Sequence, residues 1–263
     1  HDTHQPYVPE KIDFCGEVVP LERRDVFESL EREMIVTTFA HTNTSLILKR
    51  MHRYFPMIEN ILKEEGIPED FKYLAVTESN LYDISRSPVG AIGIWQFMEA
   101  TGKEYGLEIN SEIDERYNIE KSTRAACKYL RKAYAEFGSW TLVAASYNGG
   151  MNGVKKAMSL QKQSSYYDML WLEETARYVF RIVAFKALMS DPDKYGFHID
   201  KDGWYEPWKT TTVEIDSTIP DLAQFAIDKG TTYKRVKELN RWIRQNKITN
   251  ARRKTYRILI PNE

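Results

Sequence analysis

The sequence lacks any run of eighteen or more apolar residues, which excludes a membrane-spanning helix from this chain. Residues 1–9 are polar and lack the apolar core of a secretory signal. The protein is therefore either cytosolic or has lost its signal, and composition does not decide between the two.

Cysteine is scarce, with only Cys15 and Cys127 in 263 residues. Two cysteines are too few for a disulfide scaffold, and their spacing does not fit a zinc site. We expect two unpaired thiols, with a bridge as the alternative, and no metal. Cys127 lies in a helical stripe and is expected beside buried surface.

The formal net charge is only −1, yet charge is unevenly distributed. Residues 229–263 contain eleven Lys and Arg but two Glu, so this segment carries +9 and residues 1–228 carry −10. A basic end can face solvent, an anionic wall polymer or nucleic acid. We favour the first two and expect no nucleic-acid partner, because no groove-reading motif is present.

The hydrophobic pattern predicts a mainly α protein with a small C-terminal module. Helical periodicity dominates residues 21–190, and residues 191–209 are rich in Asp, Gly, Pro and aromatics without that period. Residues 210–216, 219–230, 233–243 and 255–261 predict a strand, two helices and a strand. The expected organisation is an arm (1–20), a helical domain (21–195), a linker (196–209) and a βααβ module (210–263) that is separable near Lys209.

A carboxylate lies on the apolar face of the helix predicted in GIPEDFKYLAVTESN. Phe71, Leu74 and Ala75 occupy positions i, i+3 and i+4 of this face, and Glu78 occupies i+7. A buried carboxylate either pairs with a cation, for which Arg86 is a candidate, or has a raised pKa. A raised pKa suits a general acid near neutral pH.

Three further segments carry polar residues at breaks between helices. In SPVGAIGIWQFM, Gly90 and Gly93 permit a tight turn before a helix expected to begin near Trp95. In LVAASYNGG, Tyr147 and Asn148 end a helix, and LEETARYV places Glu174 and Tyr178 one helical turn apart on one face.

Together and in this order, the four segments resemble the catalytic domain of the soluble lytic transglycosylase family, which has a lysozyme-like fold. The family patterns E-S, S-x-x-G-x-x-G-x-x-Q, A-x-Y-N and E-T-x-x-Y match Glu78–Ser79, Ser87–Gln96, Ala145–Asn148 and Glu174–Tyr178. The residues GIWQFM and the segment 26–67 look most similar to the membrane-bound lytic murein transglycosylase D type. The resemblance covers about residues 20–195.

This resemblance implies a monomeric enzyme that acts on peptidoglycan strands in the bacterial periplasm, attached to the outer membrane through a leader absent from this chain. Glu78 is then the catalytic acid and base. The implied substrate-binding residues are Ser87, Gln96, Met98, Tyr147, Asn148, Glu174 and Tyr178. The alternatives from the residues alone are a helix cap for Asn148, a core side chain for Met98 and an ion-pairing residue for Glu174.

The sequence shows no second carboxylate tied to Glu78 by a motif, although most glycosidases need two. Asp83 and Glu99 are the acids nearest in sequence to the turn at residues 92–97, and neither matches a family position. The resemblance implies that the C6 hydroxyl of N-acetylmuramic acid attacks instead, giving a 1,6-anhydro product without any cofactor. A hydrolytic muramidase and a non-catalytic glycan-binding protein are the alternatives.

The βααβ module resembles a LysM domain, a module that binds glycans containing N-acetylglucosamine. The resemblance is carried by Leu222, Ala223, Ala226, Gly230, Leu239-Asn240 and Leu259-Ile260-Pro261. The Gly that usually precedes the last strand is absent, and Arg252, Arg253 and Lys254 occupy that stretch. This departure weakens the inference of glycan binding more than the inference of fold.

Overall fold

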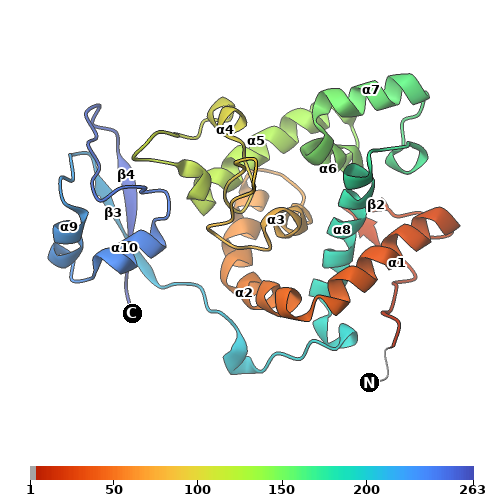
Figure 1. Ribbon diagram of the computed structural model, residues 1–263, viewed down its shortest axis with the longest axis horizontal. Coiled ribbons are helices and arrows are strands. Elements are labelled where there is room, and N and C mark those ends of the chain that lie inside the picture. The colour runs from red at the N-terminus through yellow and green to blue at the C-terminus, as the bar shows by residue number, and fades with distance from the viewer. Residues whose placement is uncertain (1–3) are drawn as a thin grey trace. The chain divides into compact units, whose positions relative to one another are not determined.

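The computed structural model describes residues 4–263, and Figure 1 shows the order of its elements. The chain forms two compact units, each built from two stretches of sequence. Unit 1 comprises the residues up to Leu81 and Cys127–Tyr205, and unit 2 comprises Tyr82–Ala126 and Glu206–Glu263. These units group the chain differently from the domains predicted from sequence, whose bounds remain a prediction, because residues 82–126 are placed with the C-terminal segment.

Unit 1 is mainly helical. An antiparallel hairpin pairs β1 (Asp13–Phe14) with β2 (Glu17–Val18). The helices of this unit are α1 (Arg24–Phe39), α2 (His41–Glu64), α3 (Phe71–Ser79), α6 (Trp140–Gly149), α7 (Met151–Gln161) and α8 (Glu173–Ser190), with short 3-10 turns η2 (Tyr166–Asp168), η3 (Pro192–Tyr195) and η4 (Lys201–Gly203). The division between the units falls within α5 (Ile119–Phe137).

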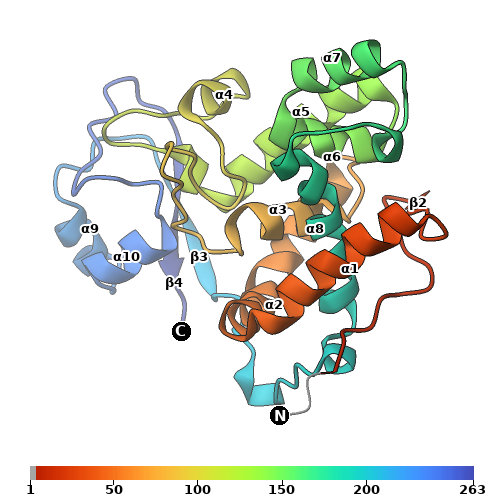
Figure 2. The same ribbon diagram turned by 45° about the vertical axis from the view of Figure 1, so that its right-hand side comes forward.

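Helix α8 lies at the centre of unit 1 and packs against α1, α3 and α6 (Figure 2). Its buried residues fall on several faces, as in a helix surrounded by protein. Because α3 and α6 both contact α8, a side chain on α8 can approach the ends of both helices.

Helix α3 begins at Phe71, three residues after Pro68. Before it, the carbonyls of Pro68, Glu69 and Asp70 each accept a hydrogen bond from the amide three residues ahead, which makes this turn tighter than an α-helix. The predicted apolar stripe is buried, with Phe71, Leu74 and Ala75 each 0% exposed. The helix ends at Asn80, which adopts left-handed φ of 53°.

The N-terminal arm is tied into unit 1 by two carboxylates. Glu17 accepts hydrogen bonds from the backbone amides of Trp140 (2.7 Å) and Thr141 (2.9 Å), so it caps the first turn of α6. Asp13 and Asp70 both contact the ammonium group of Lys186 on α8, at 3.2 and 2.7 Å. The arm therefore fixes the start of α6 and the start of α3.

Within unit 2, residues 82–98 form turns rather than the helix expected near Trp95. Ile92 pairs with both Arg86 and Phe97 as isolated antiparallel bridges, and the indole of Trp95 donates to Thr123 Oγ1 at 2.9 Å. Helix α4 (Glu99–Glu104) begins only afterwards and is followed by the 3-10 turn η1 (Glu115–Tyr117). The sequence prediction placed this helix start four residues too early because that indole contact spans a long stretch of chain.

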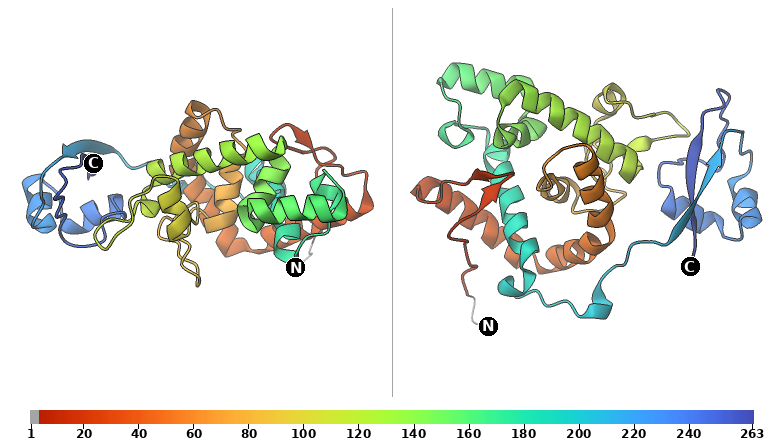
Figure 3. Two further views of the ribbon diagram at one scale, coloured as in Figure 1. Left: turned by 90° about the horizontal axis from the view of Figure 1, so that it is seen from above. Right: turned by 180° about the vertical axis from the view of Figure 1, so that it is seen from behind.

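The C-terminal part of unit 2 has the predicted βααβ order. Strands β3 (Thr210–Ile215) and β4 (Tyr256–Pro261) pair antiparallel, and α9 (Leu222–Asp228) and α10 (Tyr233–Leu239) lie on one face of this pair (Figures 1 and 3). Helix α10 ends before the predicted residue 243. The buried Asn240 ends it by donating to the carbonyls of Val236 and Leu259 and accepting from the Leu259 amide, each at 2.8 Å.

The fold class predicted from sequence is confirmed: the protein is mainly α, with a lysozyme-like helical domain and a small LysM-like module. Both cysteines are free thiols, and Cys127 is buried as expected. No helix among the described residues has the length and apolarity needed to cross a membrane. The same residues contain no group of three or more His, Cys, Asp or Glu side chains suited to a metal ion.

Candidate active site

Glu78 lies in the last turn of α3, where the helix meets α8. Its side chain is partly buried, and its Oε1 accepts a hydrogen bond from the hydroxyl of Tyr178 on α8 at 2.5 Å. Tyr178 itself is only 3% exposed. The carboxyl group of Glu78 is therefore held by a neutral donor from the central helix of unit 1.

Burial raises the pKa of Glu78 to about 7. The hydrogen bond from Tyr178 and the positive charge of Arg181 oppose this rise in pKa, while the negative charge of Glu174 adds to it. Both the protonated and the ionised carboxyl are therefore accessible near neutral pH. A group with such a pKa can donate a proton in one step and accept one in the next.

Two tyrosines near Glu78 stay protonated at neutral pH. Burial, together with the charge of Glu78, holds the pKa values of Tyr147 and Tyr178 well above the ordinary value for tyrosine. The ring of Tyr147 packs edge-on against Tyr129, with centroids 5.4 Å apart. Tyr129 donates in turn to the carbonyl of Ser146 at 2.9 Å, so this contact helps to hold the Tyr147 ring at the end of α6.

Asn148 joins the end of α6 to the start of α8. Its Nδ2 donates to Glu174 Oε1 at 3.1 Å, and its Oδ1 accepts from Thr175 Oγ1 at 2.8 Å. A Cβ at the next residue, Gly149, would lie 3.2 Å from the same threonine oxygen, so the helices approach closely here. These contacts make Asn148 a link between two helices, and they hold Glu174, which is exposed to solvent.

Ser87, Gln96 and Met98 belong to unit 2, in the segment 87–98 that we call the site turn. Ser87 Oγ accepts from the Ala91 amide at 2.9 Å, which leaves its hydroxyl hydrogen outside that bond. Gln96 has φ of 53° and its amide donates to the carbonyl of Gly93 at 2.8 Å. Met98 is 43% exposed, so it is not a core side chain.

The structure thus divides the predicted site residues into two groups. Unit 1 brings together Glu78, Tyr147, Asn148, Glu174 and Tyr178, and unit 2 contains Ser87, Gln96 and Met98 on one turn. The sequence analysis missed Arg181, whose charge acts on both Glu78 and Tyr178. Its position, one helical turn after Tyr178 on the face that carries Glu174, is the signal that could have found it.

Tyr178→Phe tests the contact between Tyr178 and Glu78. Loss of the hydroxyl removes the hydrogen bond that stabilises the ionised carboxylate, so the pKa of Glu78 rises further. The alkaline limb of the activity profile should shift upward by roughly half a unit to one unit. The pH dependence of kcat measures this shift, with Tyr73→Phe as the control, because Tyr73 is a buried tyrosine of α3 whose hydroxyl contacts Ser190. An alkaline limb that stays in place or moves to lower pH would show that the bond does not tune Glu78.

Two protein-family models match parts of the chain. Residues 55–170 match the transglycosylase SLT domain, and residues 211–263 match the soluble lytic transglycosylase C-terminal LysM-like domain. The two matches describe a helical transglycosylase-type domain followed by a LysM-like module. The chain therefore contains a transglycosylase SLT domain and a C-terminal LysM-like domain, and it is homologous to lytic transglycosylases.

Curated relatives share parts of the chain. Membrane-bound lytic murein transglycosylase D of Escherichia coli (strain K12) is 26% identical over 196 residues, which are 73% of this chain and 43% of that protein. Peptidoglycan transglycosylase gp16 of Escherichia phage T7 is 32% identical over 100 residues, 37% of this chain and 8% of that protein. The chain thus spans less than half the length of these relatives.

Among solved structures, the 70 kDa soluble lytic transglycosylase of Escherichia coli is 21% identical, with a TM-score of 0.45. The alignment covers 59% of this chain and 27% of that one. The inactive E503Q mutant of the Pseudomonas aeruginosa lytic transglycosylase Slt is 20% identical with a TM-score of 0.44, covering 58% of this chain and 26% of that one.

Proposed function

We propose that this protein cleaves the β-1,4 bond between N-acetylmuramic acid and N-acetylglucosamine in peptidoglycan and forms a 1,6-anhydro-N-acetylmuramic acid end. The observation that carries the proposal is Glu78, a carboxyl with a pKa of about 7 held by Tyr178. The match to the transglycosylase SLT domain and the two curated relatives whose names refer to murein or peptidoglycan transglycosylases support it. The proposed site of action is the periplasm, on glycan strands.

In the proposed reaction, protonated Glu78 donates its proton to the glycosidic oxygen while the bond from that oxygen to C1 of N-acetylmuramic acid breaks. The resulting carboxylate then takes the proton from the C6 hydroxyl of the same sugar, and O6 forms a bond to C1. Glu78 ends the cycle protonated, and no water is added. An intramolecular attack of this kind has an effective molarity of about 10⁵ M or more, against about 55 M for water.

The residues around Glu78 support both proton transfers in this proposal. Tyr178 donates to the carboxylate formed after the first transfer, and the charge of Arg181 favours the same ionised state. Burial favours the protonated state. The opposing effects keep the pKa close to neutral, which lets one group serve as acid and then as base.

The two acids that flank the site turn in sequence, Asp83 and Glu99, form ion pairs with other residues. Asp83 pairs with Arg241 at 3.2 Å, and Glu99 pairs with Lys103 at 2.8 Å. A glycosidase that hydrolyses its substrate with inversion of the anomeric configuration needs a second carboxylate to activate water. The ion pairs of Asp83 and Glu99 do not favour that role, so attack by the substrate's own hydroxyl is the preferred mechanism.

Digestion of peptidoglycan in water labelled with heavy oxygen tests the proposed product. We expect unlabelled fragments whose mass matches anhydro ends, because no water enters the reaction. Mass spectrometry of the soluble fragments measures both quantities, with a hydrolytic muramidase as the positive control for label incorporation. Label at new reducing ends would show that the protein is a hydrolase, and intact glycan after incubation would support a non-catalytic binding protein.

A further inference from the structure

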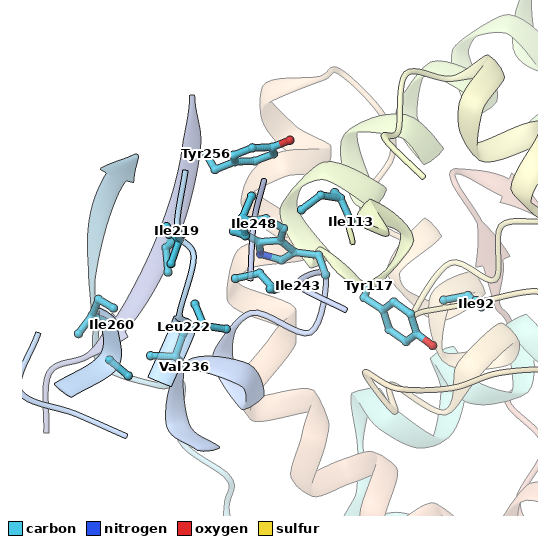
Figure 4. Close-up of a cluster of buried hydrophobic side chains, with 13 residues drawn as sticks. Ile92, Ile113, Tyr117, Ile219, Leu222, Val236, Ile243, Ile248, Tyr256 and Ile260 are labelled. Carbon is cyan, nitrogen blue, oxygen red and sulfur yellow. The ribbon is translucent and has the colours of Figure 1, made fainter. Parts of the chain in front are cut away.

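The hydrophobic core of the LysM-like module extends into residues 82–126 of unit 2. Figure 4 shows one buried cluster in which Ile92, Ile113 and Tyr117 join the module side chains. The module members of the cluster are Ile219, Leu222, Ala226, Val236, Trp242, Ile243, Ile248, Tyr256, Ile258 and Ile260. A shared core of this kind is expected where two segments fold as one body rather than as tethered modules.

Backbone hydrogen bonds fix the register of this contact. The Asp114 amide donates to the carbonyl of Trp242 at 2.9 Å, and the Arg244 amide donates to the carbonyl of Glu112 at 2.8 Å. Ile113 and Ile243 pair as an antiparallel bridge between these two bonds. The module thus supplies a short strand partner to residues 112–114.

Side chains of the module also contact side chains of residues 108–117. Tyr256 donates its hydroxyl to Glu108 at 2.6 Å, and Thr249 donates its hydroxyl to Glu112 at 2.7 Å. The guanidinium of Arg244 lies 4.1 Å from the ring centroid of Tyr117. The contact therefore combines apolar burial with hydrogen bonds at several positions along residues 108–117.

Arg116, which follows residues 112–114, connects the module's contact with these residues to the site turn. Its guanidinium pairs with Asp114 at 2.8 Å, and the two side chains are only 7% and 10% exposed. Its Nη1 donates to the carbonyls of Gly90 and Phe97, each at 3.2 Å. One buried cation therefore holds both arms of the turn that carries Ser87 and Gln96, and charge-assisted bonds of this type are stronger than neutral ones.

Gly93 brings the turn into direct contact with the same residue. A Cβ at Gly93 would lie 2.1 Å from the carbonyl oxygen of Arg116, and the φ of Gly93 is +84°. Only glycine combines this backbone conformation with such a close approach. The site turn is therefore seated on the backbone of Arg116 as well as on its side chain.

We propose that Arg116 is a positioning residue for Ser87, Gln96 and Met98, and that the LysM-like module holds Arg116 in place through Trp242, Ile243 and Arg244. The module then supports substrate binding at the site turn in addition to any affinity of its own for glycan. This inference rests on the proposed function for its effect on catalysis. Its effect on the order of the turn is independent of that function.

Arg116→Lys in the full chain tests the positioning role. Lysine keeps the charge but lacks the planar fork that pairs with Asp114 while donating to two carbonyls. We expect KM for soluble glycan to rise about tenfold or more, as for loss of a charged hydrogen bond. The pH dependence of kcat, which Glu78 sets, should stay unchanged. A merely structural role would reduce the fraction of active protein and lower kcat without raising KM.

Ile243→Ala tests the contribution of the LysM-like module, because it truncates the buried residue that pairs with Ile113 in the antiparallel bridge. Val236→Ala is the matched control, since Val236 is equally buried in the module and lies away from Ile113 and Tyr117 in Figure 4. We expect a higher KM with Ile243→Ala and an unchanged KM with Val236→Ala.

Hydrogen exchange of the amides of Ala91, Ile92 and Gly93 gives a readout that does not require activity. Faster exchange in Arg116→Lys and Ile243→Ala, but not in Val236→Ala, is the expected result. If Arg116→Lys and Ile243→Ala both remain active with unchanged exchange and unchanged KM, the positioning role of Arg116 is wrong, while the proposed function stands. Faster exchange in a protein that cuts no glycan would contradict the proposed function while the turn-holding role stands.

Discussion

Glu78→Gln is expected to lower the rate of glycan cleavage by at least about 10³-fold, because the same carboxyl group serves both proton transfers. Glutamine has nearly the same shape, and its amide oxygen can still accept the hydrogen bond from Tyr178. Release of soluble fragments from peptidoglycan by purified protein measures the loss. Glu173→Gln is the matched control and should retain most activity, since Glu173 is an exposed carboxylate on α8 that pairs with Arg32 and is not among the site residues.

The same variant should be more stable than the wild type at alkaline pH. The folded pKa of Glu78, about 7, lies above the ordinary value of 4.5, so the folded state binds the proton more tightly than the unfolded state. The destabilisation from the buried charge is absent below about pH 4.5 and complete above about pH 7, where it amounts to about 1 to 3 kcal/mol. The melting temperature of Glu78→Gln should therefore exceed that of the wild type near pH 8 and match it near pH 4. Strong residual turnover, or a stability difference with the opposite pH dependence, would contradict the assigned role of Glu78.

A chain shortened to end at Lys209 is expected to lose activity on soluble glycan by about tenfold or more, not only its attachment to insoluble peptidoglycan. Removal of the module exposes Ile92, Ile113 and Tyr117, each now at most 8% exposed, and removes the backbone partners of residues 112–114. Exposure of three large apolar side chains costs several kcal/mol. Residues 82–126 should then be loosened together with the site turn.

Cleavage of soluble fragments and thermal unfolding of the shortened protein measure this effect. The full chain carrying Arg257→Ala is the control, because Arg257 is an exposed cation on β4 and its loss alters charge without opening the core. The sequence alone predicted the opposite, a separable module after a Gly- and Pro-containing linker. Equal rates for the shortened and full chains would support that earlier prediction and show that the shared core is dispensable.

Local patterns predicted the elements that depend on neighbouring residues. The helical spacing of Phe71, Leu74 and Ala75 predicted the buried face of α3 and placed Glu78 on it, and the strand predicted at residues 255–261 is β4. These predictions succeeded because periodicity reports directly which side of an element is buried.

Features that depend on distant partners were not predictable in the same way. Trp95 was expected to start a helix, but its indole bonds to Thr123, and α10 stops early because Asn240 bonds to Leu259. Arg116 lies in a polar stretch of sequence, as a surface residue would. The carbonyls to which it donates belong to residues 19 and 26 positions earlier. Long-range contacts of this kind leave no periodic signal in the sequence.

The pairing of Tyr82–Ala126 with Glu206–Glu263 in one compact unit also has a consequence for the order of folding during synthesis. The chain emerges from the ribosome with its N-terminus first, and domains generally fold as units once their segments have emerged. Residues 112–114 cannot form their backbone hydrogen bonds until residues 242–244 have been synthesised. Closing this long loop is therefore a late and entropically unfavourable step in folding. A nascent chain would therefore carry Glu78 without a completed site turn until residues 242–244 have been made.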